Sequence, residues 1–173
     1  MQTSWDGSTY TKGNVCDTFA EFNIVCADLP FKLYPEAKEV VAKDWVGEDG
    51  VEVYVPSQLR VKDYDMEATF LYTGNNQSTM REEIDEFIRY LQGRITTVDD
   101  APIGARLAIS EEYTQTGRKD VVFVSVEFDT WWASPAEDTE YIARFKVKFH
   151  VYDPVTNVGQ VKTNDVVTDL TWT

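Results

Sequence analysis

One group of side chains in this sequence that could carry chemistry is a row of carboxylates. Asp63, Asp65 and Glu67 alternate with apolar residues, so a strand would place all three on one face. Carboxylates two residues apart on a strand are about 7 Å apart, close to the acid pair of an inverting glycosidase, and such a row could also hold calcium. Half-exposed sheets nevertheless favour a simpler interpretation, in which the row is the wet face of an amphipathic strand. We interpret Glu127 and Asp129 in the same way.

The single histidine, His150, would have to serve any histidine-dependent relay. It follows Arg144, Lys146 and Lys148 at every second position, which places it on the polar face of a strand. A general base needs a nucleophile within reach, and the sequence contains neither G-x-S-x-G nor H-E-x-x-H. We therefore interpret His150 as a solvated strand residue. We expect no catalytic residue and predict that the protein is not an enzyme; a small hydrolase built on the carboxylate row has the least support.

Two adjacent tryptophans, Trp131 and Trp132, are the third feature. They could stack on a sugar ring, which would make the protein a carbohydrate-binding β-sandwich module. They could also fill the end of the core or a seam between subunits, because large rigid aromatic side chains are enriched at interfaces. The core or seam interpretation is favoured, and sugar binding is the alternative.

The sequence gives little support for a metal or a cofactor. Cys16 and Cys26 form no CxxC pair, so a zinc site is not indicated. The first residues contain no basic start and no apolar stretch, so we predict no secretory signal and expect free thiols rather than a disulfide. Residues 47–50 contain two glycines but lack the lysine and helix of a phosphate-binding loop.

Charge limits the possible partners. The 173 residues include 30 acids and 16 bases, for a formal net charge of −14. A fold-wide negative field repels nucleic acid phosphates, and no basic cluster interrupts the acids, so we predict no sequence-specific nucleic acid binding. No apolar run approaches the roughly 18 residues of a membrane helix, so no membrane partner is expected.

One segment, residues 79–92, is predicted to be a helix. Its apolar residues recur at the helical spacing and form one stripe. Thr79 and Glu82 have the spacing of a capping box, and Gly93 is a plausible stop. The stripe consists of Met80, Ile84, Phe87, Ile88 and Leu91.

Most of the remaining chain alternates with period two, as antiparallel strands with one buried face do. Three rows of inward-facing residues are predicted. Each consists of every second residue, starting from the first, within 64–72, 122–128 or 141–151. Shorter strands are expected at 21–27, 31–34, 51–55 and 106–112, with a turn at 115–118 and one or two strands within 158–173.

These elements predict a mainly β fold, an antiparallel β-sandwich flanked by one α-helix. We expect a single domain over residues 1–173, with a core at about 20–155 and arms or edge strands at 1–19 and 156–173. Residues 35–50 and 96–104 are expected to be irregular. The first of these is charged and contains two glycines, which favours a long exposed loop.

The order of the elements resembles the N-terminal, ring-forming half of a phage distal tail protein. The resemblance covers residues 20–155 and is carried by VEVYVP at 51–56, KDYDMEATF at 62–70 and the helix around 84–91. After the helix, residues 105–112 and 121–129 resemble the hairpin that follows in the family, and 141–152 resembles its closing strand. Many family members continue into a second sandwich, which we do not expect in this chain. A tail-tube, tail-terminator or other ring-forming tail protein is therefore an alternative within the resemblance.

The resemblance implies a tail-tube-like sandwich, no catalysis and no cofactor. It implies a structural protein of a phage or prophage tail that self-associates into a hexameric ring and contacts other tail proteins. Its location would be the tail of the virion, after assembly in the cytoplasm of the bacterial host. An acidic wall would also keep DNA from sticking as it passes through a tube.

A ring subunit must commit loops and sheet edges to its neighbours. Residues 35–50 are the best candidate for reaching an adjacent subunit, because they combine charges with the apolar residues Val40, Val41 and Trp45. These three residues, with Trp131 and Trp132, are the predicted interface residues.

Overall fold

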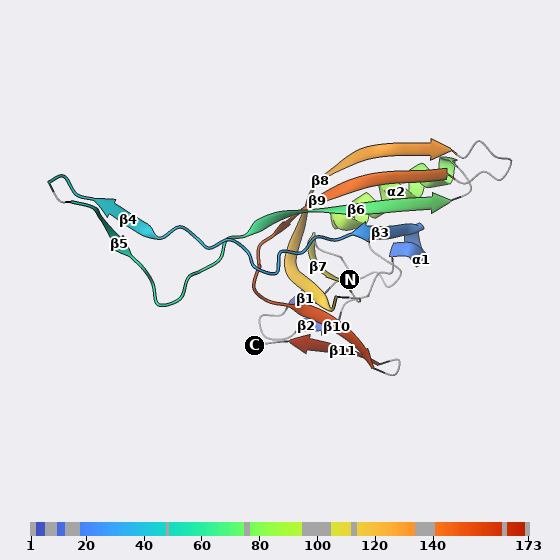
Figure 1. Cartoon of the computed structure of the whole chain (residues 1–173). Coiled ribbons are helices and arrows are strands. Elements are labelled where there is room, and N and C mark those ends of the chain that lie inside the picture. Colours follow the sequence, from blue (N-terminus) through green and yellow to red (C-terminus); the bar gives the residue numbers. More distant parts are fainter. Residues whose placement is uncertain are drawn as a thin grey trace.

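The computed structural model describes residues 3–5, 10–12, 18–47, 49–74, 77–94, 105–111, 114–133, 141–163 and 166–171. Its centre is a five-stranded antiparallel sheet with the order β3-β6-β9-β8-β7, which curls along the long strand β8 (Figure 1). The strands are β3 (Ile24–Asp28), β6 (Tyr64–Gly74), β7 (Arg106–Glu111), β8 (Thr116–Ala133) and β9 (Tyr141–Val151).

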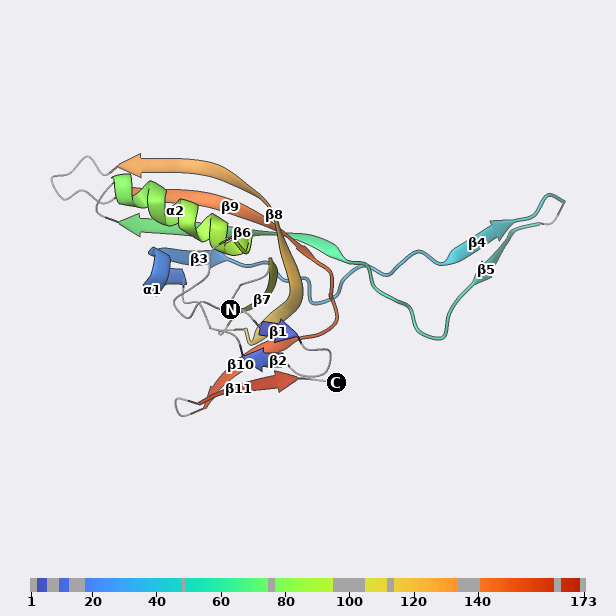
Figure 2. The same cartoon turned by 180° about the vertical axis from the view of Figure 1, so that it is seen from behind.

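The core lies on one face of this sheet, beneath the helix α2 (Gln77–Leu91) (Figure 2). Alternate residues of β6 and β9 are paired in register and buried, as their period-two pattern predicts. Phe87 of α2 lies 5.2 Å from the ring of Phe70 and 6.2 Å from that of Phe145, between ring centroids. The short helix α1 (Thr18–Phe22) adds Phe22, whose ring centroid is 5.7 Å from that of Phe87.

The predicted helix is confirmed, with one correction at its start. α2 begins at Gln77, so Thr79 lies inside the helix and the predicted capping box is wrong. The predicted stop at Gly93 is confirmed by a Schellman motif. Gly93 N–H donates to the Tyr90 carbonyl at 2.9 Å, Arg94 N–H donates to the Arg89 carbonyl at 2.9 Å, and Gly93 has a φ of 69°.

The predicted inward row at 122–128 is wrong in its first half because β8 contains a bulge. Val121 pairs with Val151 and Phe123 with Phe149, so these residues, not Val122 and Val124, continue the core row. The register then shifts between Phe123 and Ser125, which leaves Val124 as the extra residue. Beyond the bulge Val126 pairs with Val147 and Phe128 with Phe145. Val126 packs partly buried against the core as predicted, whereas Phe128 is 39% exposed.

Two shorter predictions also need correction. The strand predicted at 21–27 is the end of α1 followed by β3, and no strand forms at 31–34. The strands predicted within 158–173 are confirmed as the antiparallel pair β10 (Val158–Thr163) and β11 (Val166–Thr171), and a second small pair joins β1 (Thr3–Trp5) to β2 (Tyr10–Lys12).

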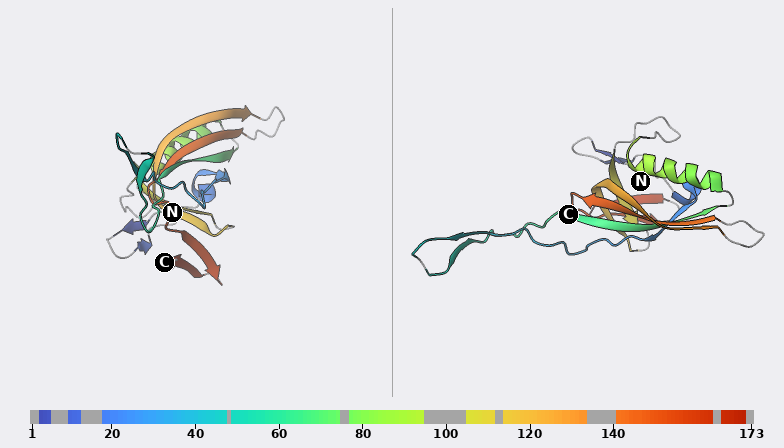
Figure 3. Two further views of the ribbon diagram at one scale, coloured as in Figure 1. Left: turned by 60° about the vertical axis from the view of Figure 1, so that its left-hand side comes forward. Right: turned by 90° about the horizontal axis from the view of Figure 1, so that it is seen from above.

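The most extended feature is a ribbon that leaves the body between β3 and β6 (Figure 3). We call residues 35–62 the arm. Its outer part is a two-stranded hairpin of β4 (Val41–Asp44) and β5 (Val51–Tyr54), which confirms the strand predicted at 51–55. The loop predicted at 35–50 is exposed as expected and forms the first half of a longer exposed element, but the prediction that it is irregular is wrong over β4.

The predicted mainly β, antiparallel fold flanked by one substantial helix is confirmed. Among the described residues, no helix is long and apolar enough to cross a membrane.

Candidate functional site: the exposed arm and its base

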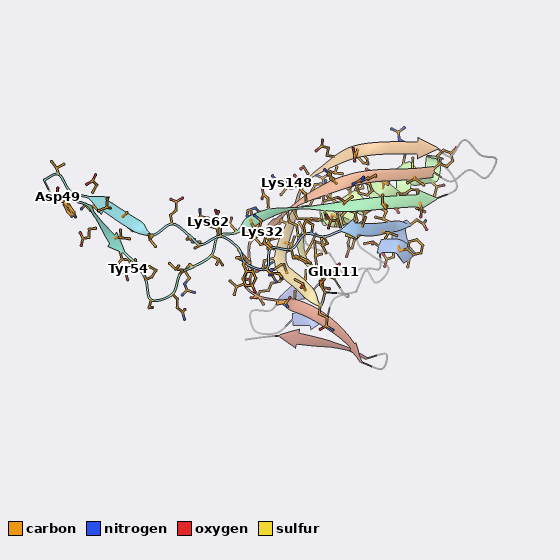
Figure 4. The ribbon with its side chains drawn as sticks, in the orientation of Figure 1. Lys32, Asp49, Tyr54, Lys62, Glu111 and Lys148 are labelled. Atoms are coloured by element: carbon orange, nitrogen blue, oxygen red, sulfur yellow. The ribbon has the colours of Figure 1, made fainter. Side chains whose placement is uncertain are left out.

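The arm exposes an unusual number of large apolar side chains. Tyr54 is 71% exposed, Val41 72% and Val46 fully exposed, and none of these residues belongs to the described core. Figure 4 shows Asp49 and Tyr54 on the part of the arm that lies far from the body. An exposed apolar surface of this kind is typical of a segment that contacts another molecule.

The hairpin register gives the arm two different faces. Val41 pairs with Tyr54 and Lys43 with Glu52, so these four residues share one side. On this side Lys43 Nζ lies 3.5 Å from the centroid of the Trp45 ring, and Trp45 Nε1–H donates to Glu52 Oε2 at 2.9 Å. Trp45 is therefore held by a cation–π contact and a hydrogen bond while it remains 44% exposed.

The opposite side of the hairpin is more apolar. Ala42 pairs with Val53 and Asp44 with Val51, and the two valines are about half exposed. Val53 and Val51 do not belong to the described core cluster. This side therefore carries two partly exposed apolar side chains that the described core does not bury.

At the base of the arm its two chain segments are joined to each other. Ala37 and Val61 form an antiparallel bridge, Lys62 N–H donates to the Glu36 carbonyl at 2.7 Å, and Lys38 N–H donates to the Arg60 carbonyl at 2.7 Å. These bonds fix the two segments as one ribbon before they reach the sheet. Lys62 Nζ also lies 3.8 Å from Glu36 Oε2 and 3.6 Å from Glu39 Oε1.

The outgoing segment is held by a buried arginine of β8. Arg118 is 4% exposed, and its Nη2 donates to the Lys32 carbonyl at 3.2 Å. Its guanidinium carbon lies 6.0 Å from the centroid of the Phe31 ring. Lys32 N–H also donates to the hydroxyl of Tyr64 at 3.3 Å. The arm is thereby attached to the body just before it begins.

The returning segment is held by a charged group that we call the base cluster: Asp63, Asp65, Lys148 and His150. His150 Nε2 lies 2.8 Å from Asp63 Oδ2, and His150 Nδ1 lies 2.6 Å from Asp65 Oδ1. Lys148 Nζ lies 2.7 Å from Asp65 Oδ2. Figure 4 labels Lys148 beside the point where the arm enters the sheet, with Lys32 and Lys62 nearby.

Electrostatics support these contacts. The hydrogen bond with Asp65 raises the pKa of His150, against the effect of burial, and Asp63 adds to the rise. The bonds from Lys148 and then His150 lower the pKa of Asp65, and the bond to Asp65 raises the pKa of Lys148. Within the described part of the chain, no three His, Cys, Asp or Glu side chains are placed to hold a metal ion.

The structure brings together some of the residues that the sequence marked. Asp63 and Asp65 lie with His150, so His150 is a partly buried, doubly bonded side chain and not simply a solvated one; Glu67 is paired in register with Lys148. No pattern in the sequence indicates the contact between His150 and Asp63, which are 87 residues apart. The alternation of polar and apolar residues indicates only that each lies on the polar face of its own strand.

The predicted interface residues fall in two places. Val40, Val41 and Trp45 lie on the arm and are exposed. Trp131 and Trp132 lie within β8, opposite Ala143 and Ile142 of β9, and only their backbone is described. Cys26 is a free thiol, whereas Cys16 lies outside the described residues.

Comparison with known proteins gives a structural similarity. No protein-family model matches the chain, and no curated protein matches it. The structure is similar to the crystal structure of SPP1 Dit (gp 19.1), described as a paradigm of the hub adsorption apparatus in phages that infect Gram-positive bacteria. The TM-score is 0.45 with 15% identity, over 82% of this chain and 49% of the other.

This chain therefore spans about half the length of that phage protein. SPP1 Dit is a distal tail protein, and the resemblance found in the sequence was to the same group. The description as a hub adsorption apparatus applies to SPP1 Dit. The function of the present chain is proposed from its own residues and surfaces.

Proposed function

We propose that this chain is a non-enzymatic structural protein of a phage or prophage tail, and that copies of it associate into a ring at the tail tube or tail tip. Its place would be the virion tail, with other tail proteins as partners, after assembly in the host cytoplasm. The order of elements in the sequence supports this proposal, as does the arm. The single domain over 1–173, with its core at about 20–155, stays a prediction.

The observation that carries the proposal is the exposed arm. A ribbon with half-exposed valines on one side and Trp45 and Tyr54 on the other buries little within its own chain. Contact with a neighbouring copy would cover this surface, and a heterologous contact that closes on itself produces a ring. Val40, Val41 and Trp45 would belong to that contact.

The open edges of the sheet give secondary support. β3 is the last strand at one end of the sheet, and among the described residues no strand pairs with β8 beyond Val122 on its β7 side. Unpaired edges are a hazard in a monomer and a resource in an assembly. We propose that neighbouring copies cover these two edges.

The experiment is to measure the solution mass by light scattering over a concentration series, with negative-stain images of the same sample. Rings or stacked tubes are the expected result. A strict monomer at every concentration, with and without tail proteins from the same source, would contradict the proposal. In that case a glycan array would test the alternative, sugar binding through Trp131 and Trp132.

Two variants locate the contact. Val53→Asp adds a charge to the apolar side of the arm and should abolish assembly, while Trp45→Ala should weaken it, both without unfolding the subunit. Val155→Asp makes the same change at an exposed valine of the body and serves as the matched control. If Trp45→Ala unfolds the chain, Trp45 is a core residue; if Val53→Asp and Val155→Asp assemble equally well, the arm is not the contact.

A further inference from the structure

The base cluster has a geometry that only one protonation state satisfies. Both ring nitrogens of His150 face carboxylate oxygens, at 2.6 Å on the Asp65 side and 2.8 Å on the Asp63 side. An ionised carboxylate only accepts hydrogen bonds, and a neutral imidazole carries a single N–H. Only the imidazolium form donates to both residues. With Lys148, the cluster then contains two negative and two positive charges.

One further carboxylate lies beside the cluster: Glu67 of β6 is the register partner of Lys148 and adds to the rise in the pKa of Lys148. Asp65 of β6 and Asp63 just before it face His150. Lys148 of β9 and Tyr152 just after β9 flank it, and the Tyr152 ring centroid lies 4.4 Å from that of His150. On β8 the register partner of His150 is Val122. Arg106 of β7 stands next in that row and bonds to Asp120.

The two segments at the arm base are therefore held by different chemistry. The outgoing segment depends on the guanidinium of Arg118, which donates to the Lys32 carbonyl. The returning segment depends on His150, and histidine is the side chain whose unperturbed pKa lies near neutral pH. Asp63 stands directly after Lys62, the last residue of the arm, so loss of the bond from His150 frees the returning segment at the point where it meets β6.

We propose that His150 is a proton-controlled clamp on the arm, closed while its imidazole holds a proton between Asp63 and Asp65 and open once that proton is lost. The proposal rests on the proposed function in treating the arm as the segment that meets a neighbouring subunit. The clamp then fixes the direction of the arm before assembly.

The pH range of the closed clamp follows from the direction of each shift. The pKa of His150 is raised in the folded chain, so its contribution is complete below the ordinary histidine value of about 6.5 and is lost as the pH rises through the raised value. The pKa of Asp65 is lowered, so its contribution is present above its ordinary value and is lost as the pH falls through the lowered one. The clamp is closed between these limits.

The first measurement is the titration of His150 by NMR in the full chain, at concentrations where light scattering gives a monomer. The chain has one histidine, so its ring signals need no assignment. We expect a midpoint above that of a free histidine, and a lower midpoint in Asp63→Asn. A wild-type midpoint at or below the free value overturns the proposal.

The second measurement follows the arm itself. Val61 belongs to the bridge at the arm base, and the order of its methyl groups should fall as His150 loses its proton, with the same midpoint. In Asp63→Asn the carboxamide can donate to a neutral imidazole, so this pH response should disappear. A wild-type arm base whose order does not change through the titration, or an Asp63→Asn variant with the wild-type response, overturns the clamp.

Asp129→Asn is the matched control. It makes the same chemical change in an ion pair between β8 and β9, in which Arg144 Nε lies 3.7 Å from Asp129 Oδ2, and it should keep the wild-type titration. Because the NMR measurements use the monomer, they are independent of ring formation. A coupled titration without rings at any pH would retain the clamp and reject the proposed function, and rings without a coupled titration would do the reverse.

Discussion

Phe87 shows at the scale of one residue how the helix is attached to the sheet. Its side chain is 1% exposed and contacts aromatic rings from α1, β6 and β9. Tilted and edge-to-face aromatic pairs add to the free energy gained from burying their area. The single residue thus joins three elements that are distant in the sequence.

Replacing Phe87 by Ala should lower the free energy of unfolding by about 3–5 kcal/mol, because the cavity cannot be filled by its rigid neighbours. Urea denaturation followed by circular dichroism measures this loss. Phe19→Ala, at a position that is 55% exposed, should cost much less. Equal losses in the two variants would mean that α2 does not pack on the sheet through Phe87.

Glu83 is a second residue whose effect can be measured. The hydroxyl of Tyr72 donates to Glu83 Oε2 at 2.6 Å, and Asn23 Nδ2 donates to the same carboxylate at 3.0 Å. Burial and then this carboxylate raise the pKa of Tyr72. The contact joins β6 to α2 and to the turn after α1.

Glu83→Ala should cost about 1–3 kcal/mol of the free energy of unfolding, because the buried Tyr72 hydroxyl loses its acceptor. In a double-mutant cycle with Tyr72→Phe, the second change should cost less when the first is already present. Glu86→Ala, on the exposed side of α2, is the control. Additive losses in the cycle would show that the two groups do not interact.

At the scale of elements, close backbone contacts decide how the C-terminal hairpin joins the sheet. Gly117 is the second residue of β8, and a Cβ atom at this position would overlap the carbonyl oxygen of Val158 in β10. Gly117 N–H also donates to Asn157 Oδ1 at 2.7 Å. The hairpin β10–β11 therefore approaches β8 at a point where only glycine fits.

Gly117→Ala should move β10 away from β8 while the five-stranded sheet stays folded. Amide hydrogen exchange measures the change, with faster exchange expected in β10 and unchanged exchange in β6 and β9. Ser125→Ala, further along β8, is the control because Ser125 is exposed and lies beyond the bulge. Protection of β10 at the wild-type level in the Gly117 variant would contradict the role given to this contact.

At the scale of the whole molecule, net charge opposes association. Each chain carries a formal charge of −14, so copies brought together in a ring repel one another. Salt screens this repulsion, and at 0.1 M ionic strength the Debye length is about 10 Å, so exposed charges that are further apart interact little. Contacts made by the apolar side of the arm are insensitive to the ionic strength in the same range.

Assembly should therefore begin at a lower protein concentration as the salt concentration is raised. Light scattering over a concentration series at several ionic strengths tests this, with the Val53→Asp variant as a control that should not assemble at any of them. Assembly that weakens with salt would mean that ion pairs between copies, rather than apolar contacts, hold the ring.

The sequence determined the elements whose pattern is local. The alternation in 64–72 and 141–151 and the helical stripe of α2 each follow from which side of a strand or helix faces apolar surroundings. Gly93 was also predictable, because a left-handed C′ residue favours glycine. The exposure of Val40, Val41 and Trp45 agreed with the charge and glycine content of residues 35–50.

Tertiary structure alone decided the rest, because it depends on register between distant segments. Because of the bulge at Val124, Val122 and Val124 do not lie on the face that alternation predicted. No residue type nearby indicates this bulge. The pairing of β6 with β9 brought Asp63 and Asp65 to His150, across more than 80 residues of sequence. A period of two assigns a residue to a face, whereas only the register between strands assigns it a neighbour.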